Sequence, residues 1–344
     1  MLAAAAVGMP CAAAPAAAAG AGQVDFRFED ARISESSGLA LSARHTHTVW
    51  TVNDSGDTAR VFAVDTGTGA TVGVHTFDAT VHDVEALAVT PQGRMLVADI
   101  GDNGASRDVV RVFWFDEPKL GRTSGPRGGP ASWELRYPDG PHDAEAIAVD
   151  PRSGRVVVVT KGRPGSVYAL PTSPSRQGVN RLTRVGSAPS TVTDAVYLPD
   201  GSALAVRSYT SLHLLDPRTW TEQLTTLLPL QPQGETLAVA PGGTGVLVGS
   251  EGRGSRVQEL ALPQQPTTST STATATPTTS PPNSSTAPSS VPTTLAPTPG
   301  HGAGGDDGAP LVVNRGELVA GLGASAGLVL LALLVVRLSR RHRR

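Results

Sequence analysis

A short motif recurs five times between Ser37 and Leu262, and it constrains the fold more than any other feature of the chain. Its full form is an acidic residue followed by four small or apolar residues. The copies are Ser37-Gly-Leu-Ala-Leu41, which lacks the acid, Glu85-Ala-Leu-Ala-Val89, Glu145-Ala-Ile-Ala-Val149, Asp194-Ala-Val-Tyr-Leu198 and Glu235-Thr-Leu-Ala-Val239. They lie 48, 60, 49 and 41 residues apart, a spacing typical of architectures in which each copy forms one supersecondary unit.

Each copy continues with the same sequence of local signals. A Pro/Gly turn such as Pro91-Gln-Gly93 or Pro199-Asp-Gly201 follows the motif, as in a tight hairpin. Second strands are predicted at Thr48–Val52, Met95–Ala98, Val156–Thr160, Ala203–Val206 and Val246–Gly249, and third strands at Arg60–Val64, Val110–Phe115, Ser166–Leu170, Leu212–Leu215 and Arg256–Leu262. No stretch here keeps a 3.6-residue apolar period, so the sequence predicts an all-β fold, a β-propeller with four-stranded blades over residues 24–262.

Five motifs predict five blades. Six blades are the alternative, if the long interval between Glu85 and Glu145 contains a further one. The segment Val24–Glu29 alternates apolar and polar residues before the first motif. We expect it to supply the outer strand of the last blade and so to close the ring and remove an open sheet edge.

The two ends of the chain have other compositions. Residues 1–22 are almost all Ala, Gly and Pro and are expected to be a signal peptide. Residues 263–316 are rich in Thr, Ser, Pro and Gly and predict a disordered stalk, either glycosylated or bare. Residues 317–337 contain the uncharged run Leu318–Val336, long enough for a transmembrane helix, and the basic tail 338–344 follows.

These segments predict the location of the protein. Five arginines fall in the last eight residues, RLSRRHRR, and the positive-inside rule places that end in the cytoplasm. We therefore expect a single-pass protein of the cell membrane, partnered with the bilayer through residues 317–337, whose N-terminal domain is extracellular at the cell surface.

Composition excludes several classes of function. The chain has 28 basic and 30 acidic residues, and the terminal arginines leave residues 24–262 acidic, so nucleic-acid binding is not expected. Its single cysteine, Cys11, lies in the leader, which excludes a disulfide framework, a thiolate zinc site and cysteine catalysis in the mature domain. No Gly-x-Ser-x-Gly elbow or ordered Ser-His-Asp set indicates a serine hydrolase.

Polar residues are expected to converge at one end of the propeller channel. In such a ring the first strand of each blade lines the channel, so the residues that open the motifs would gather there with those that follow the second strands. The predicted ligand-binding residues at this mouth are Ser37, Asp54, Glu85, Glu145, Lys161, Asp194, Arg207, Glu235 and Glu251. Carboxylates and an Asn carbonyl suit Ca²⁺, and the predicted calcium ligands are Asp99, Asp102, Asn103, Glu85 and Glu145.

The acids also have a purely structural interpretation. An acid at a fixed point of every blade would accept backbone N–H bonds from the next blade and lock the ring. The twin sequences His82-Asp83-x-Glu85 and His142-Asp143-x-Glu145 have the same two interpretations, as ligands or bases and as loop positions bonded to the backbone.

Several stretches resemble a group of secreted bacterial propellers described as phytase-like or esterase-like. They are Ala98-Asp-Ile-Gly-Asp-Asn103, Tyr137-Pro-Asp-Gly-Pro-His-Asp-Ala-Glu-Ala146, Thr160-Lys161 and Val206-Arg-Ser-Tyr-Thr210, and the resemblance covers about residues 30–262. It implies calcium and phosphate binding at one face of the ring, by the acids with Lys161 and Arg207. The order of signal, propeller, stalk, helix and Arg tail is similar to that of actinobacterial surface proteins.

Two functions are consistent with these features. The first is a membrane-anchored surface propeller that binds an extracellular ligand or protein at its acidic mouth. The second is a calcium-dependent hydrolase of phosphoester, ester or lactone bonds at the same mouth, in which the metal activates water and Lys161 and Arg207 stabilise developing charge.

Overall fold

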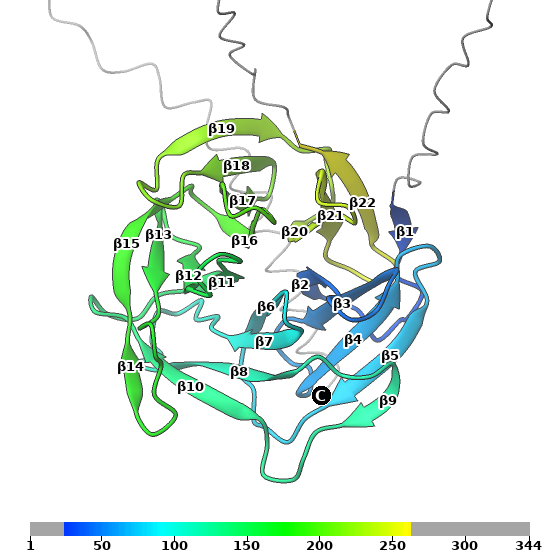
Figure 1. Cartoon of the computed structure of the whole chain (residues 1–344), viewed down its shortest axis with the longest axis horizontal. Coiled ribbons are helices and arrows are strands. Elements are labelled where there is room, and N and C mark those ends of the chain that lie inside the picture. Colours follow the sequence, from blue (N-terminus) through cyan, green and yellow to red (C-terminus); the bar gives the residue numbers. More distant parts are fainter. Residues whose placement is uncertain (1–23, 263–344) are drawn as a thin grey trace, which may run out of the picture. The chain divides into compact units, whose positions relative to one another are not determined.

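Five short strands surround the centre of the domain, one at the inner edge of each of five small sheets (Figure 1). The computed structural model describes residues 24–262. The inner strands are β2 (Ser36–Leu41), β6 (Val84–Val89), β11 (Ala144–Val149), β16 (Val192–Tyr197) and β20 (Gly234–Val239). Each contacts the next, and β20 contacts β2, so the ring is closed. The five predicted motifs are these strands, and the five-bladed propeller is confirmed.

The first two blades have five strands each. Blade 1 is β2, β3 (Thr48–Asn53), β4 (Arg60–Asp65), β5 (Thr71–Thr76) and β9 (Gly121–Ser124). Blade 2 is β6, β7 (Arg94–Asp99), β8 (Val110–Asp116), β10 (Ala131–Arg136) and β14 (Val179–Arg181).

The other three blades have four strands each. Blade 3 is β11, β12 (Val156–Thr160), β13 (Gly165–Ala169) and β15 (Thr183–Ala188), and blade 4 is β16, β17 (Leu204–Ser208), β18 (Ser211–Leu215) and β19 (Glu222–Leu227). Blade 5 is β20, β21 (Gly245–Ser250), β22 (Arg256–Ala261) and β1 (Asp25–Arg27). Every predicted second and third strand is present, with ends shifted by a residue or two.

The six-blade alternative is wrong, and the long interval between Glu85 and Glu145 has another cause. After β8 the chain returns to blade 1, where β9 pairs in parallel with β5, before β10 continues blade 2. Later β14 pairs in parallel with β10 in the same way. Strand β9 thus covers the outer edge of blade 1, and β14 covers that of blade 2. Each protects backbone groups that would otherwise be unpaired at the edge of a sheet.

The N-terminal strand closes the ring as predicted. Residues 25–27 of β1 pair antiparallel with Arg256–Gln258 of β22. Phe26 and Phe28 are buried beside Val257, and their rings meet edge to face with centroids 5.6 Å apart. The first and last strands of the domain therefore share one sheet.

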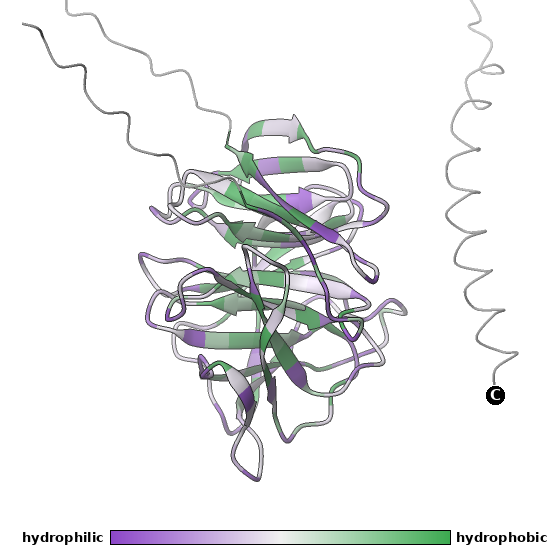
Figure 2. Cartoon of the chain, turned by 90° about the vertical axis from the view of Figure 1, so that its right-hand side faces the viewer, coloured by the Kyte–Doolittle hydropathy of each residue, from purple (hydrophilic) through white to green (hydrophobic). Residues whose placement is uncertain are grey.

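The core lies between the blades. Five clusters of apolar side chains fill the spaces between successive sheets, and each contains residues from two neighbouring blades. Hydrophobic residues follow the strands and hydrophilic ones concentrate in the connecting loops (Figure 2). The loops are therefore the part of the domain with polar side chains free for other uses.

The predicted signal peptide (1–22), stalk (263–316), transmembrane helix (317–337) and basic tail (338–344) lie outside the described residues. Within residues 24–262 every regular element is a strand, and no helix there could span a bilayer.

Candidate functional site

A β-bulge at the same place in every blade builds the mouth of the channel. The pairing of each inner strand with its second strand shifts by one residue near the start, so one residue of the inner strand has no partner. Such a bulge re-aims a side chain away from the regular alternation. The bulged residues are Ser37, Glu85, Glu145, Thr193 and Glu235.

The register corrects the sequence alignment in blade 4. We call the place of the bulged residue in each inner strand the ring position. In blade 4 it is occupied by Thr193 and not by Asp194, because Asp194 pairs with Arg207 of β17. The Asp194 carboxylate is fully buried and accepts the N–H of Ala195 at 2.8 Å and that of Leu237 at 2.6 Å. Asp194 therefore locks blade 4 to blade 5, as the structural interpretation of the acids predicted. Burial raises its pKa well above the ordinary value, against the hydrogen bonds.

Arg207 is a second lock between the same two blades. Its side chain is buried, and Nη1 donates to the carbonyl oxygens of Thr236 at 2.7 Å and Gly249 at 2.9 Å. A Cβ on Gly234 would lie 2.1 Å from Arg207 Nη2, so glycine makes room for the guanidinium. Burial lowers the pKa of Arg207 to about 10. Nη2 donates to the side chain of Gln231, and Nε is buried without a partner in residues 24–262. With Nη1 and Nη2 engaged by blade 5 and the loop before it, Arg207 acts here as a connection between blades.

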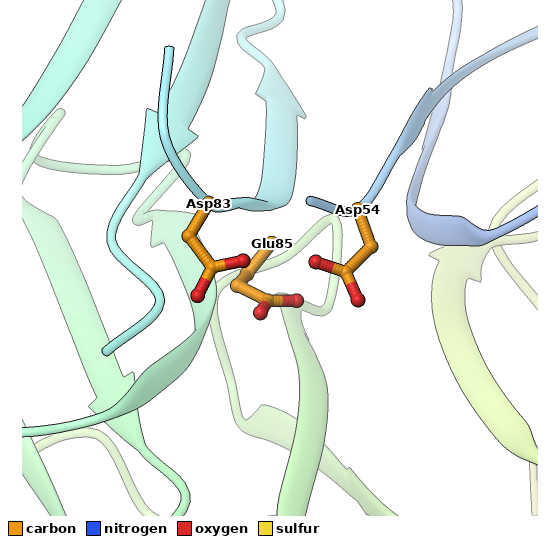
Figure 3. A group of neighbouring side chains, drawn as sticks. All are labelled: Asp54, Asp83 and Glu85. Carbon is orange, nitrogen blue, oxygen red and sulfur yellow. The ribbon is translucent and has the colours of Figure 1, made fainter. Parts of the chain in front are cut away.

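Three carboxylates from two blades form a tight cluster. Asp54 directly follows β3 in blade 1, Asp83 directly precedes β6 in blade 2, and Glu85 is the bulged residue of β6. One ligand oxygen from each lies within 4.8 Å of the others, and the three side chains point toward one another (Figure 3). Ser37 Oγ donates to Glu85 Oε2 at 2.9 Å and to its backbone oxygen at 2.8 Å, which fixes the Glu85 carboxylate.

Gly101 leaves room for this cluster. A Cβ at this position would lie 2.5 Å from Asp83 Oδ2 and 2.6 Å from Glu85 Oε1. The Gly101 N–H donates to the backbone oxygen of Asp83 at 3.1 Å, so the loop is held against the acids. Any side chain at residue 101 would have to displace the carboxylates.

Two of the three carboxyls in the cluster have raised pKa values. Burial, the neighbouring Asp54 and then Asp143 raise the pKa of Asp83 to about 7. Burial and the carboxylates of Glu145, Asp54 and Asp83 raise the pKa of Glu85 well above its ordinary value. Like charges confined in a partly desolvated site favour a bound cation for the same reason that they favour protonation.

Glu145 and Lys161 form the one carboxylate–ammonium pair among the described mouth residues. Lys161 Nζ lies 2.8 Å from Glu145 Oε1 and 5.6 Å from the ring centroid of Tyr209. Burial raises the pKa of Glu145 to about 8, although Lys161 opposes the shift. Burial works against the charge of Lys161, but Glu145 and Tyr209 outweigh it, so its pKa is raised.

Glu235 has an oxygen that no described residue satisfies. It occupies the ring position of blade 5 and is 5 % exposed. Oε1 accepts from the side chain of Gln233 at 3.0 Å, whereas Oε2 is buried without a hydrogen-bond partner in residues 24–262. Nearby Glu251 has its pKa raised to about 7 by burial and by Glu235. A buried carboxylate oxygen without a donor is the kind of group that a cation or a ligand N–H would satisfy.

The predicted calcium ligands Asp99, Asp102 and Asn103 lie outside the carboxylate cluster, and Asp99 holds the backbone next to it. Asp99 accepts the N–H of Asp83 at 3.0 Å and pairs with Arg107 at 2.9 Å, while Asp102 accepts the N–H of Arg107 at 2.7 Å. Asn103 is exposed. The structure thus brings Glu85 into the acidic cluster, but it engages Asp99 with Arg107 and the backbone before β6, and Asp102 with its own loop.

Asp83 is the site residue that sequence reasoning undervalued. The twin His-Asp-x-Glu sequences contained the signal, because residues two apart near a bulge both face the channel. The two histidines of these sequences are not part of the carboxylate cluster. His82 is largely exposed, and His142 lies 3.0 Å from Asp139 and 2.9 Å from the Tyr168 hydroxyl. In the second copy Asp143 accepts the N–H of Asp102 at 2.8 Å, which ties blade 3 to the loop of blade 2.

No protein-family model matches the chain, and no curated protein matches it significantly. The case for a function therefore depends on the geometry of the mouth, and the resemblance to phytase-like propellers stays a prediction.

Proposed function

We propose that this protein is a membrane-anchored cell-surface propeller whose acidic mouth holds a divalent cation and binds an extracellular ligand through it. The observation that carries the proposal is the cluster of Asp54, Asp83 and Glu85, with its oxygens within 4.8 Å of one another. The buried, unpartnered Oε2 of Glu235 supports it independently. The anchor is the expected helix at residues 317–337.

The donor set favours a hard cation. All the groups are carboxylate oxygens, which Ca²⁺ prefers, and Ca²⁺ takes 6–8 oxygen ligands, so a site with three protein carboxylates keeps positions for water or for a ligand. Such a cation would also neutralise the charge that raises the pKa of Asp83. An extracellular ligand with its own carboxylate, phosphate or hydroxyl oxygens would complete the coordination.

A calcium-dependent hydrolase at the same mouth is the second candidate, and Lys161 is the observation that favours it. Its ammonium lies in the mouth, where it would stabilise negative charge on a substrate oxygen. Its pairing with Glu145 at 2.8 Å reduces that capacity, so the binding function is the better supported of the two.

The test is a thermal-shift titration of the purified protein with Ca²⁺ and with Mg²⁺, against chelator. At one hundred times the dissociation constant, binding adds about 2.7 kcal/mol to the free energy of unfolding. For a domain of this size each kcal/mol raises Tm by roughly 2–4 °C, so the shift is measurable. A substrate panel of phosphoesters, esters and lactones, with and without Ca²⁺, distinguishes the two candidate functions.

Two glycines of one loop supply matched variants. Gly101→Ala displaces the carboxylates of Asp83 and Glu85, whereas a Cβ on Gly104 meets nothing closer than Ser106 Oγ at 3.6 Å. We expect the first variant to lose the calcium response and the second to keep it. A wild-type protein whose Tm does not respond to either cation, or a G101A protein that responds fully, contradicts the proposed site.

A further inference from the structure

Blade 4 carries a continuous chain of hydrogen bonds on its two outer strands, away from the carboxylate cluster. Ser211 Oγ lies 2.8 Å from His213 Nε2, and His213 Nδ1 lies 2.7 Å from Glu222 Oε2. Ser211 and His213 are half-buried, and Glu222 is exposed on the edge strand. A hydroxyl on Nε2 and a carboxylate on Nδ1 of one imidazole is the arrangement that activates a serine nucleophile.

The strand register explains why these side chains meet. Ser211 and His213 are two residues apart on β18 and share a face, while Leu212 and Leu214 are buried on the other. On β19, Thr225 lies directly opposite His213. The pairing then shifts, leaving Gln223 unpaired, so that Leu215 is opposite Glu222. This bulge directs Glu222 to the face of His213, where a regular strand would place it on the other side.

One arrangement of protons fits these contacts, with His213 Nδ1–H shared between Glu222 Oε2 at 2.7 Å and Thr225 Oγ1 at 3.0 Å. Glu222 accepts from His213 Nδ1–H and from the Thr225 hydroxyl, and its pKa is lowered, first by Thr225 and also by His213. His213 Nε2 is then unprotonated and accepts the Ser211 hydroxyl. Ser208 Oγ lies 2.6 Å from Ser211 Oγ and serves as donor to it. Ser211 Oγ thus faces a base that is oriented by a carboxylate.

We propose that Ser211, His213 and Glu222 form a second functional site, which hydrolyses carboxylic esters. Ser211 Oγ forms a bond to the ester carbonyl carbon while its proton passes to His213 Nε2. The carbon–oxygen bond to the alcohol then breaks, and the alcohol leaves with that proton. Water attacks the acyl-serine, gives a proton to His213, and releases the carboxylic acid as Ser211 recovers its proton. Glu222 is a positioning residue, because it acts through the imidazole.

The turn before Ser211 contains two backbone N–H groups that the proposal assigns to the oxyanion. Tyr209 and Thr210 connect Ser208 to Ser211, and their backbone N–H groups donate no hydrogen bond to any residue of the described range 24–262. Backbone amides beside a nucleophile stabilise the negative oxygen of a tetrahedral intermediate.

Exposed leucines beside the serine indicate the acyl group. Leu227 lies directly opposite Ser211 in the ladder and is 82 % exposed, and Leu230 in the following loop is 92 % exposed. Directly opposite residues share a face with their Cβ atoms about 4.5–5.5 Å apart. An apolar acyl chain bound to Ser211 would cover Leu227. We therefore expect a preference for butyryl or longer esters over acetyl esters.

The test is labelling of the full-length protein with a fluorophosphonate probe, followed by peptide mass spectrometry, together with hydrolysis of p-nitrophenyl butyrate. We expect one adduct, on Ser211, and hydrolysis above the uncatalysed rate. Ser211→Ala should abolish both, and His213→Gln should lower the hydrolysis rate by roughly 10²-fold or more, the range of general-base catalysis. Leu227→Ser should reduce the preference for butyrate over acetate by about 10-fold.

The control serine is Ser153, which donates to Asp150 Oδ2 at 2.6 Å in an exposed turn and has no histidine partner. Ser153→Ala should label and hydrolyse as the wild type does, and circular dichroism verifies the fold of each variant. Either of two results overturns the proposal: wild-type protein that takes no label on Ser211 while a reference serine hydrolase does, or folded H213Q protein that labels at the wild-type rate. Added chelator should not alter labelling, which separates this site from the proposed cation site.

Discussion

The carboxylate of Asp194 in blade 4 accepts the backbone N–H of Leu237 in blade 5 at 2.6 Å. This hydrogen bond connects the inner strands of two neighbouring blades. Asp194 is the residue after the one whose side chain belongs to the ring around the mouth. The neighbouring Thr193 occupies the ring position, and its hydroxyl oxygen has no partner within residues 24–262.

This pair of residues gives a stability prediction. Asp194→Ala leaves the buried N–H groups of Ala195 and Leu237 without acceptors and should lower the free energy of unfolding by about 2–4 kcal/mol. Thr193→Val removes only an unpartnered hydroxyl and should change it by less than about 1 kcal/mol. Urea unfolding of both variants measures this. The opposite ranking would mean that Asp194, not Thr193, occupies the ring position.

The closing strand gives a second prediction. Phe26 is buried in the core between blades, so Phe26→Ala should cost about 3–5 kcal/mol. Arg27 is exposed on the other face of the same strand, and Arg27→Ala should cost no more than about 0.5 kcal/mol. A chain that begins at Ala31 lacks β1 altogether and should melt well below the intact domain. Equal melting temperatures for the two chains would refute closure by β1.

The pKa shifts at the mouth predict an unusual pH dependence. Asp83, Glu251 and Glu145 have their pKa values raised to about 7, 7 and 8, so in this range the folded state binds more protons than the unfolded state. Stability without metal should therefore fall as the pH rises from about 5 toward 8. His75, whose pKa is lowered by burial, contributes in the opposite direction, but it is one group against three. Carboxyls with lowered pKa, such as Asp30 at about 2, titrate below this window.

Thermal melts in chelator from pH 5 to pH 8 check the direction. Saturating Ca²⁺ should flatten the profile, because a bound cation compensates the charge that the protons would otherwise neutralise. Asp83→Asn removes one of the three groups and should reduce the slope. A Tm that rises steadily across this range in chelator would contradict the assignment of the raised pKa values.

The proposed topology is tested on intact cells. If residues 317–337 cross the membrane with the arginines inside, external protease should release a fragment close in size to residues 24–262. The closed ring should resist cleavage, and the stalk expected at residues 263–316 would be the accessible substrate. Protease added to lysed cells provides the control. If the propeller stays protected in intact cells and is released only after lysis, the proposed topology is wrong.

The fold was predictable because its signals are periodic. The motif, the Pro/Gly turn and the apolar second strand recur in each blade, and even the closing strand was visible in the alternation of Val24–Glu29. The added strands β9 and β14 were not, since Gly121–Ser124 and Val179–Arg181 are short, exposed and held by neighbouring edges rather than by an apolar face.

The site was less predictable, because a bulge cannot be read from composition. A shift of one residue turns a side chain from the channel to the space between blades. In Thr193-Asp194 either residue could be the bulged one, and the hydropathy pattern does not distinguish them. Arg207 followed the same strand pattern as Lys161, yet one side chain is buried under blade 5 and the other reaches the mouth. The Ser211–His213–Glu222 relay depends on another bulge, at Gln223, and had no sequence motif to indicate it.

The shared sheet of the first and last strands has a mechanical consequence. Strand β22 is hydrogen-bonded to β21 on one edge and to β1 on the other, so tension applied to the chain beyond residue 262 must break two ladders to extract it. Without β1 the same pull would peel a single edge strand. A domain pulled from its C-terminal side therefore bears the load on a strand that is paired on both edges. A single-molecule pulling experiment should show one high-force event rather than blade-by-blade unravelling.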